Sequence, residues 1–90
     1  HIPTADCRVL DGGTAYQTDA GMCGDYNSVI GMDKQAATSR FTGGSGGRLS
    51  VASGAPSLCG VLVDVELATG LAKQARSFRR GGALENTSAV

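Results

Sequence analysis

Few residues of this chain have side chains that could do chemistry: one His, three Cys and a small set of acidic residues. A Ser or Cys nucleophile needs a neighbouring base to take its proton, and the only His in the chain is His1. We therefore expect no nucleophilic triad and no complete catalytic group within these residues. His1 taken alone is weak support for a metal site, because a lone His is more often structural.

Four carboxylates near the start of the chain could in principle supply oxygen ligands to a hard cation. They are Asp6, Asp11, Asp19 and Asp25. A calcium loop places ligands at its first, third and fifth positions and closes with Glu, and that spacing is absent here. We therefore interpret these side chains as turn-forming and capping groups.

The cysteines, Cys7, Cys23 and Cys59, are odd in number and widely spaced. They have neither the pairing of a zinc site nor the density of a disulfide scaffold. We interpret them as reduced thiols of a cytoplasmic protein that pack as small hydrophobic side chains.

Two segments in the first third of the chain must position whatever chemistry is present. Residues 8–10 and 14–18 flank Asp11-Gly12-Gly13, and an Asp-Gly pair supplies the positive φ that a tight reversal needs, so we predict a β-hairpin. Residues 21–31 mix turn-forming and apolar side chains, which predicts an ordered loop packed on a scaffold. Its start, residues 19–24, could be an active-site loop or a plain turn.

A short helix is predicted next. Asp33 can cap it with its carboxylate, and the helix would run to Arg40 or Phe41, with Gly43 placed to end it. The Gly-rich run 43–47 reads as a flexible linker. Because the Lys and Ser/Thr of a phosphate-binding P-loop do not follow that run, we expect no nucleotide binding there.

The strongest structural pattern lies in the second half of the chain. Apolar and charged residues alternate over residues 61–67, which predicts a strand covered on one side. Residues 68–70 would form a turn, and residues 71–78 would return antiparallel, although they also fit a helical stripe. Residues 49–52 are a further candidate strand beside them. Arg76, Arg79 and Arg80 read as a solvated strand end, and we expect a disordered tail over residues 81–90.

Composition limits the chain as a whole. Ninety residues with fourteen Gly and four aromatic residues can bury only a modest core. Eight basic and eight acidic residues cancel, so we expect no nucleic-acid polymer and no membrane as a partner. The chain starts at His1 with no initiator Met, and we expect a soluble fragment of a longer protein.

Several unusual sequence motifs follow one another in order, and His1 belongs to the first of them. They are residues 1–6 (HIPTAD), 13–22 (GTAYQTDAGM), 31–34 (GMDK), 40–41 (RF) and 58–64 (LCGVLVD). This ordered series resembles the YmdB-like metallophosphoesterases, a branch of the calcineurin-like superfamily. The resemblance covers residues 1 to about 79, and the Gly-rich run is its poorest part.

The resemblance implies an α/β/β/α sandwich, of which residues 1–80 would be the C-terminal portion, mostly antiparallel strands with one short helix. It implies a hydrolase, a phosphodiesterase acting on 2′,3′-cyclic nucleotides or related phosphoesters with two divalent metal ions, iron or manganese. His1 matches the last His of the family's metal-binding Thr-His-Thr-His segment. The other ligands would come from the missing N-terminal part of the same chain, so the fragment alone would be inactive, and the parent could form a homo-oligomer.

Some residues depart from the family pattern. Pro3 replaces a Gln next to the metal-binding segment, and Cys7 and Cys23 stand where the family tends to have polar residues. Substrate-binding residues are therefore not assigned. Two other classes remain open at this point: a self-standing small β-rich interaction module without catalysis, and a secreted peptide stapled by disulfides.

Overall fold

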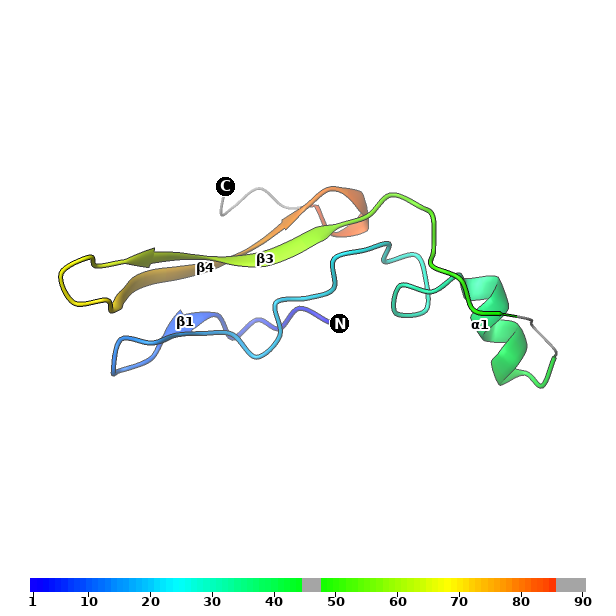
Figure 1. Ribbon diagram of the computed structural model, residues 1–90, viewed down its shortest axis with the longest axis horizontal. Coiled ribbons are helices and arrows are strands. Elements are labelled where there is room, and N and C mark those ends of the chain that lie inside the picture. The colour runs from blue at the N-terminus through cyan, green and yellow to red at the C-terminus, as the bar shows by residue number, and fades with distance from the viewer. Residues whose placement is uncertain (45–47, 86–90) are drawn as a thin grey trace.

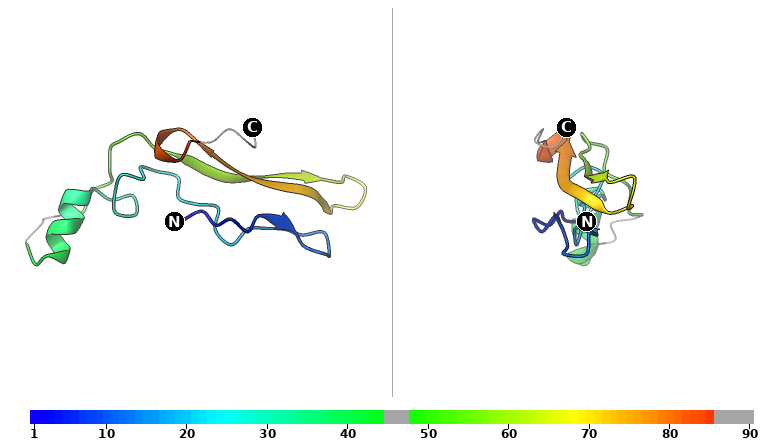
Figure 2. Two further views of the ribbon diagram at one scale, coloured as in Figure 1. Left: turned by 180° about the vertical axis from the view of Figure 1, so that it is seen from behind. Right: turned by 90° about the vertical axis from the view of Figure 1, so that its left-hand side faces the viewer.

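The computed structural model describes residues 1–44 and 48–85, which contain two antiparallel hairpins, one α-helix and one 3-10 helix (Figure 1). In the first hairpin β1 (Arg8–Val9) pairs with β2 (Ala15–Tyr16), and in the second β3 (Leu58–Val65) pairs with β4 (Ala72–Arg80). The hairpins lie side by side, with β1 and β2 in contact with β4, and α1 (Lys34–Phe41) lies beyond them at one end (Figure 2). The fold is therefore mostly antiparallel strand with one short helix, as expected.

The first hairpin forms where it was predicted, but its turn differs in detail. Leu10 N donates to Thr14 O at 2.8 Å, and Gly13 N donates to Leu10 O at 2.8 Å. The positive φ of 92° lies at Gly13, so the expectation that the Asp-Gly pair provides it was wrong. A three-residue reversal needs one left-handed residue, at its last position, because the preceding residues keep ordinary turn angles.

The second hairpin is the longest regular element among the described residues. Its register pairs Gly60 with Phe78 and Val63 with Ala75, with an irregularity between Asp64 and Val65. The segment after the turn is a strand, which decides between the two readings of residues 71–78. The first strand ends at Val65 and not at residue 67, because Glu66 N and Gly70 N already make turn hydrogen bonds to Leu71 O and Glu66 O, at 2.8 and 2.7 Å.

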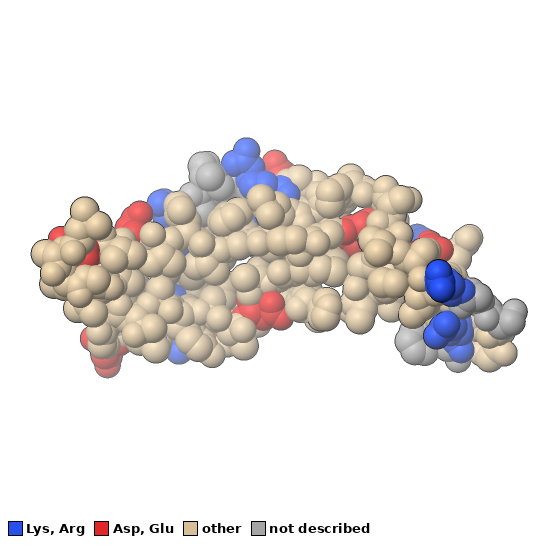
Figure 3. Space-filling view, in the orientation of Figure 1, with Lys and Arg blue, Asp and Glu red and all other residues tan. Residues whose placement is uncertain are grey.

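The hydrophobic core is very small. Among the described side chains only Ala37, Ser57 and Cys59 are buried. The expectation that one face of the strand at residues 61–67 is covered was wrong for this chain, since Val63, Val65 and Leu67 are 38%, 46% and 95% exposed. Few described apolar side chains are available to cover that face. The visible surface is largely uncharged, with acidic and basic groups dispersed and some basic groups near the α1 end (Figure 3).

The segments that lead into and out of α1 run side by side and are joined by backbone hydrogen bonds. Gly24 and Ser57 exchange both backbone hydrogen bonds, at 3.0 and 2.8 Å, and farther out Met32 pairs with Val51. The sequence suggested that residues 49–52 form a strand beside β3, and that prediction was wrong. Their hydrogen-bonding partners lie in the loop before the helix, which runs alongside them.

The helix begins and ends close to its predicted limits. Asp33 is the N-cap, but its carboxylate makes no capping hydrogen bond, so that part of the prediction was wrong. Its backbone N–H instead donates to Ser50 O at 2.7 Å, which fixes the residue through the main chain. At the other end Gly43, at φ 85°, and Gly44 donate to Arg40 O and Ser39 O, a Schellman motif that confirms Gly43 as the terminator.

The segment after β4 folds back toward the start of β3. Gly82–Leu84 form a 3-10 helix within the stretch for which we expected a disordered tail. The buried Ser57 hydroxyl donates to Gly81 O at 2.8 Å and accepts from Leu84 N at 3.2 Å. Residues 86–90, and residues 45–47 of the predicted linker, lie outside the described ranges. No helix in the described ranges is long and apolar enough to cross a bilayer.

Candidate metal-ligand site

His1 lies beside the segment that follows the first hairpin, with its side chain 64% exposed. Within residues 1–44 and 48–85 its imidazole makes no hydrogen bond, whereas its backbone is held firmly. The His1 nitrogen donates to Asp19 Oδ2 at 2.7 Å, and Ile2 N donates to the same oxygen at 3.3 Å. The ring is therefore accessible while its attachment point is fixed.

Asp19 connects two separate segments through both of its carboxylate oxygens. Oδ2 accepts from the first two residues, and Oδ1 accepts from Gly21 N at 2.9 Å. The N-terminal amino group of His1, followed by the Gly21 and Ile2 amides, lowers the pKa of Asp19 by stabilising its charged form. The segment at residues 19–21 is thus more than a plain turn, since it fixes the start of the chain.

A hydrogen-bond network surrounds this contact, and we call it the N-terminal network. Its members are Thr4, Asp6, Gln17, Thr18 and Asp19. Asp6 accepts from the hydroxyls of Thr4 and Thr18 and from Thr18 N, which lowers its pKa to about 2. Thr4 N donates to Asp19 O at 3.0 Å, and Asp19 N donates to Thr4 Oγ1 at 3.1 Å. The network joins residues 4–6 to residues 17–19.

Gln17 lies between these two segments. Its Nε2 donates to Thr4 O and to Asp19 O, each at 3.0 Å. Its Oε1 is buried with no hydrogen-bond partner among the described residues. A buried acceptor in this state is destabilising, so this oxygen is a place where a donor from elsewhere would be favourable.

The loop at residues 21–31 also approaches His1, since the Tyr26 hydroxyl lies 3.5 Å from His1 O. The Tyr26 hydroxyl accepts from Met22 N at 2.7 Å and donates to Met22 O at 2.8 Å, and it lies 3.4 Å from Cys59 Sγ. Burial, followed by the hydrogen bond with Cys59, raises the pKa of Tyr26 to about 12. The prediction of an ordered, packed loop is confirmed.

The thiols are free in all three cysteines. Cys59 is buried and fits the interpretation of a small hydrophobic side chain. Cys23 is exposed, with its Sγ donating to Cys59 O at 3.3 Å, so that interpretation was wrong for Cys23. No disulfide joins any two of these three cysteines, and the stapled-peptide reading gains no support from them.

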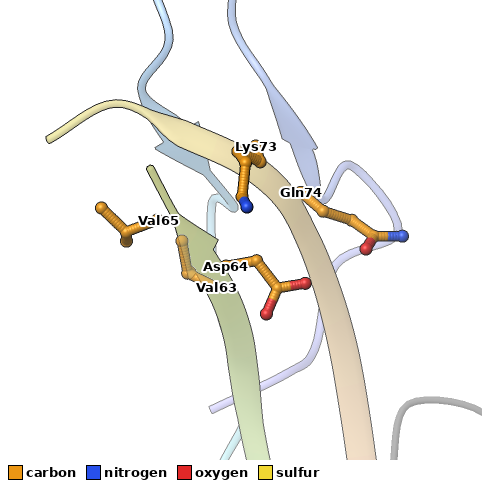
Figure 4. A pocket seen from close by; sticks show the side chains of 5 residues that line it. All are labelled: Val63, Asp64, Val65, Lys73 and Gln74. Atoms are coloured by element: carbon orange, nitrogen blue, oxygen red, sulfur yellow. The ribbon is translucent and has the colours of Figure 1, made fainter. Parts of the chain in front are cut away.

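Two hollows lie near these elements. One, of about 230 Å³, is lined by residues of the first segment, by Ala20 and by β4, namely Pro3, Thr4, Ala5, Ala20, Ser77, Phe78 and Arg79. The other, of about 580 Å³, lies near the turn of the second hairpin, where Asp64 of β3 and Lys73 of β4 contribute its charged groups (Figure 4). The smaller hollow adjoins the N-terminal network through Thr4.

The described residues offer a metal ion a single nitrogen donor and no cluster of ligands. No group of three or more His, Cys, Asp or Glu side chains in the described ranges could hold an ion. Most of the carboxylates here already accept backbone or hydroxyl hydrogens, as the sequence interpretation expected for Asp6, Asp19 and Asp25. The accessible His1 ring, in contrast, is an uncommitted nitrogen donor of the kind that transition metals bind.

The sequence pointed to His1 but not to the residues that hold it. Gln17 and Thr4 were seen only as parts of the matching motifs, and Asp19 only as a turn-forming group at the start of a possible active-site loop. Their spacing could not reveal the contacts, because the hydrogen bonds join residues 13 to 18 positions apart. The one available signal was the run of polar residues Gln17, Thr18 and Asp19 at the end of the predicted hairpin.

Comparison with known proteins gives this arrangement a family context. The sequence model of the family described as YmdB-like protein matches residues 1–78. A 2′,3′-cyclic-nucleotide 2′-phosphodiesterase of Bacillus subtilis (strain 168) is 44% identical over 66 residues, which are 73% of this chain and 25% of that protein. A Mycoplasma pneumoniae relative is 39% identical over 70 residues, 77% of this chain and 25% of its own.

A solved structure shows the same fold. The crystal structure of a phosphatase from Mycoplasma pneumoniae matches with a TM-score of 0.80 and 34% sequence identity, over 90% of this chain and 29% of that one. The chain therefore spans about a quarter of the length of the relatives that it matches.

Proposed function

This chain belongs to the YmdB-like protein family, and we propose that it supplies the C-terminal portion of a metal-dependent phosphodiesterase. Its relatives include a phosphodiesterase and a phosphatase, both enzymes that hydrolyse phosphoesters. Membership over residues 1–78 favours this reading over a self-standing interaction module. We propose 2′,3′-cyclic nucleotides as the substrate class, because the Bacillus subtilis relative is named as a 2′,3′-cyclic-nucleotide 2′-phosphodiesterase.

The observation that carries the proposal is the state of His1. Its imidazole is accessible and unbonded within the described ranges, while the backbone nitrogens of residues 1 and 2 are fixed by Asp19. A side chain prepared in this way can donate a nitrogen to a metal ion with little further ordering. When bound, two divalent ions would supply electrostatic stabilisation of the phosphoryl oxygens and an activated water.

This chain contributes one donor, and its other residues shape the surroundings. Within the N-terminal network Asp19 holds the His1 backbone in place, and the hollow lined by Thr4, Ala20 and Phe78 adjoins that network. Because a single imidazole cannot hold two ions, we propose that the remaining ligands lie in the part of the relatives' length that this chain does not span. The 90-residue chain alone would then be inactive.

A metal titration of the full-length protein that carries this segment tests the proposal. We expect the purified protein to bind iron or manganese and to hydrolyse 2′,3′-cyclic nucleotides, with the product identified by chromatography. His1→Ala should lower both metal content and turnover, because one ligand is removed. The isolated 90-residue chain should show no turnover above buffer. A full-length protein that hydrolyses the substrate equally well without any metal would refute the proposal.

A further inference from the structure

We propose that Asp19 is a positioning residue for His1, fixing the main chain from which the metal-binding imidazole projects; this inference rests on the proposed function. Asp19 Oδ2 accepts from the nitrogens of His1 and Ile2, at 2.7 and 3.3 Å, and Oδ1 accepts from Gly21 N at 2.9 Å. The carboxylate thus ties the residue that carries the ligand to the loop that follows the first hairpin.

No other side chain takes over this task in the described part of the molecule. The His1 imidazole is itself unbonded there, so its direction is set through its backbone. The nearest alternative is the Tyr26 hydroxyl, which lies 3.5 Å from His1 O but has a shorter bond to Met22 O at 2.8 Å. Because one hydroxyl hydrogen serves one strong acceptor, Tyr26 contributes little to His1.

The position of Asp19 is itself fixed by its neighbours. Its N–H donates to Thr4 Oγ1 and its carbonyl accepts from Thr4 N, at 3.1 and 3.0 Å. Gln17 Nε2 donates to the Asp19 carbonyl as well. The carboxylate is therefore presented from a constrained backbone, so a change in its acceptors is transmitted to His1 and not absorbed by movement of Asp19.

Both Asp19 carboxylate oxygens accept hydrogen bonds, so replacing the carboxylate with an amide tests whether these bonds matter. Asn has one acceptor oxygen and one NH₂ donor, so either the His1 and Ile2 nitrogens or Gly21 N would face a donor. Two of the three donors, Ile2 N and Gly21 N, are backbone amides, so the contact does not rest on the charge of the amino group alone. The effect of Asp19→Asn therefore reports the loss of an acceptor.

The test uses the full-length protein, stripped of metal and titrated with Mn²⁺, with bound metal measured by elemental mass spectrometry. We expect Asp19→Asn to weaken Mn²⁺ binding about 10–100-fold, the usual effect of losing a group that orients a ligand. The matched control is Asp25→Asn, which alters a carboxylate that accepts from Asn27 N and Gly54 N in another loop. The control should bind Mn²⁺ as the wild type does.

A second measurement separates positioning from direct ligation. In the metal-free protein we expect Asp19→Asn to change the NMR signals of the His1 ring, because the ring samples more orientations. Unchanged ring signals combined with weaker Mn²⁺ binding would overturn the positioning role and assign Asp19 as a ligand. Wild-type affinity in a folded Asp19→Asn protein would also overturn it. Should that variant not fold, Asp19→Glu, which keeps two acceptor oxygens on a longer side chain, decides by the same two measurements.

The outcomes also distinguish this inference from the function on which it rests. A wild-type protein that binds no Mn²⁺, or one whose binding survives His1→Ala, overturns the proposed metal site itself. Binding that is lost in His1→Ala and retained in Asp19→Asn overturns only the role of Asp19.

Discussion

Asp6 is the residue whose protonation should affect the stability of the fold most directly. Three hydrogen bonds, from the Thr18 and Thr4 hydroxyls and from Thr18 N, stabilise its charged form and lower its pKa from 3.8 to about 2. A carboxyl with a lower pKa in the folded state stabilises that state above its unfolded pKa. This stabilisation is lost as the pH falls from 3.8 toward 2.

We therefore predict that the thermal midpoint of the full-length protein falls more steeply below about pH 4 than that of Asp6→Asn. The two curves should converge near pH 2, where Asp6 of the wild type becomes protonated. Midpoints measured by circular dichroism at a series of pH values test this. Asp11→Asn, which removes one exposed carboxylate from the turn, controls for the loss of a charge. Parallel curves for wild type and Asp6→Asn would contradict the prediction.

At the scale of single residues the sequence indicated the roles of several side chains but not their hydrogen-bonding partners. Asp6, Asp19 and Asp25 were correctly interpreted as groups that serve turns and backbone amides, whereas the Asp33 carboxylate does not cap its helix. The pairing of Asp19 with His1 depends on how the hairpin brings residues 1–6 beside residues 17–21. No periodicity in the sequence encodes that approach, since it is made by hydrogen bonds between irregular segments.

Among the elements, the second hairpin has a close contact that a single methyl group would disturb. Gly60 pairs directly with Phe78, and a Cβ at Gly60 would lie 2.6 Å from Phe78 Cζ. We predict that Gly60→Ala lowers the free energy of unfolding by about 1–3 kcal/mol, because the ring must move. Chemical denaturation of the full-length protein measures it.

Gly12→Ala is the matched control for this substitution. A Cβ at Gly12 meets nothing within 4 Å, so its effect should stay within about 0.5 kcal/mol. If the ring is the obstacle, Phe78→Leu should cost less in the Gly60→Ala background than in the wild type. Equal effects of the two Gly substitutions would argue against the contact.

The turn at Ile30 and Gly31 is strained, and relieving it should stabilise the protein. Val29 and Met32 exchange hydrogen bonds at 2.9 Å, and both intervening residues have positive φ, 44° for Ile30. Such a turn favours Asn-Gly, and a β-branched residue there is unfavourable. We predict that Ile30→Asn raises the free energy of unfolding by about 1 kcal/mol.

Little packing is lost in this change, since Ile30 is 61% exposed. Denaturant titration of the full-length protein compares Ile30→Asn with Ile30→Val, which keeps the branched Cβ and should give no gain. A destabilised Ile30→Asn protein would show that packing on Ile30 outweighs its backbone strain.

Elements with a local signature were predictable, and those that depend on long-range pairing were not. Alternation located β3, and turn residues located the first hairpin and the end of the helix. Residues 71–78 fitted both a strand and a helical stripe, and only their register against β3 decides between them. Residues 49–52 have strand-forming composition, but their partner is the loop at Met32, which the sequence does not indicate.

At the scale of the whole molecule, the chain is too extended to bury a core of its own. Its radius of gyration is 17.2 Å, against about 12 Å for a compact domain of this length. Twelve large apolar side chains of the described residues are exposed, half of them in the second hairpin and its turn, namely Leu58, Leu62, Val63, Val65, Leu67 and Leu71. The conformational entropy of folding is therefore poorly compensated.

We predict that the isolated 90-residue chain shows no cooperative thermal transition well above room temperature. Circular dichroism of the chain alone, compared with the full-length protein, measures this. The full-length protein should give a single sharp transition in which the second hairpin takes part. A cooperative transition of the isolated chain at high temperature would contradict the prediction.

The backbone hydrogen bond from Asp33 N to Ser50 O, 2.7 Å long, closes the outer part of the chain that carries α1. Tyr26, nearer the hairpins, still contacts Met22 and Cys59, but the stretch beyond Asp33 and before Ser50 starts and ends at adjacent points, so its length can vary without shifting either hairpin. Evolutionary insertions and deletions should therefore collect between residues 33 and 50, where lengthening a connection costs little. The stretches on either side, which hold His1 and the paired strands, have no such freedom, because a single added residue would move side chains out of register.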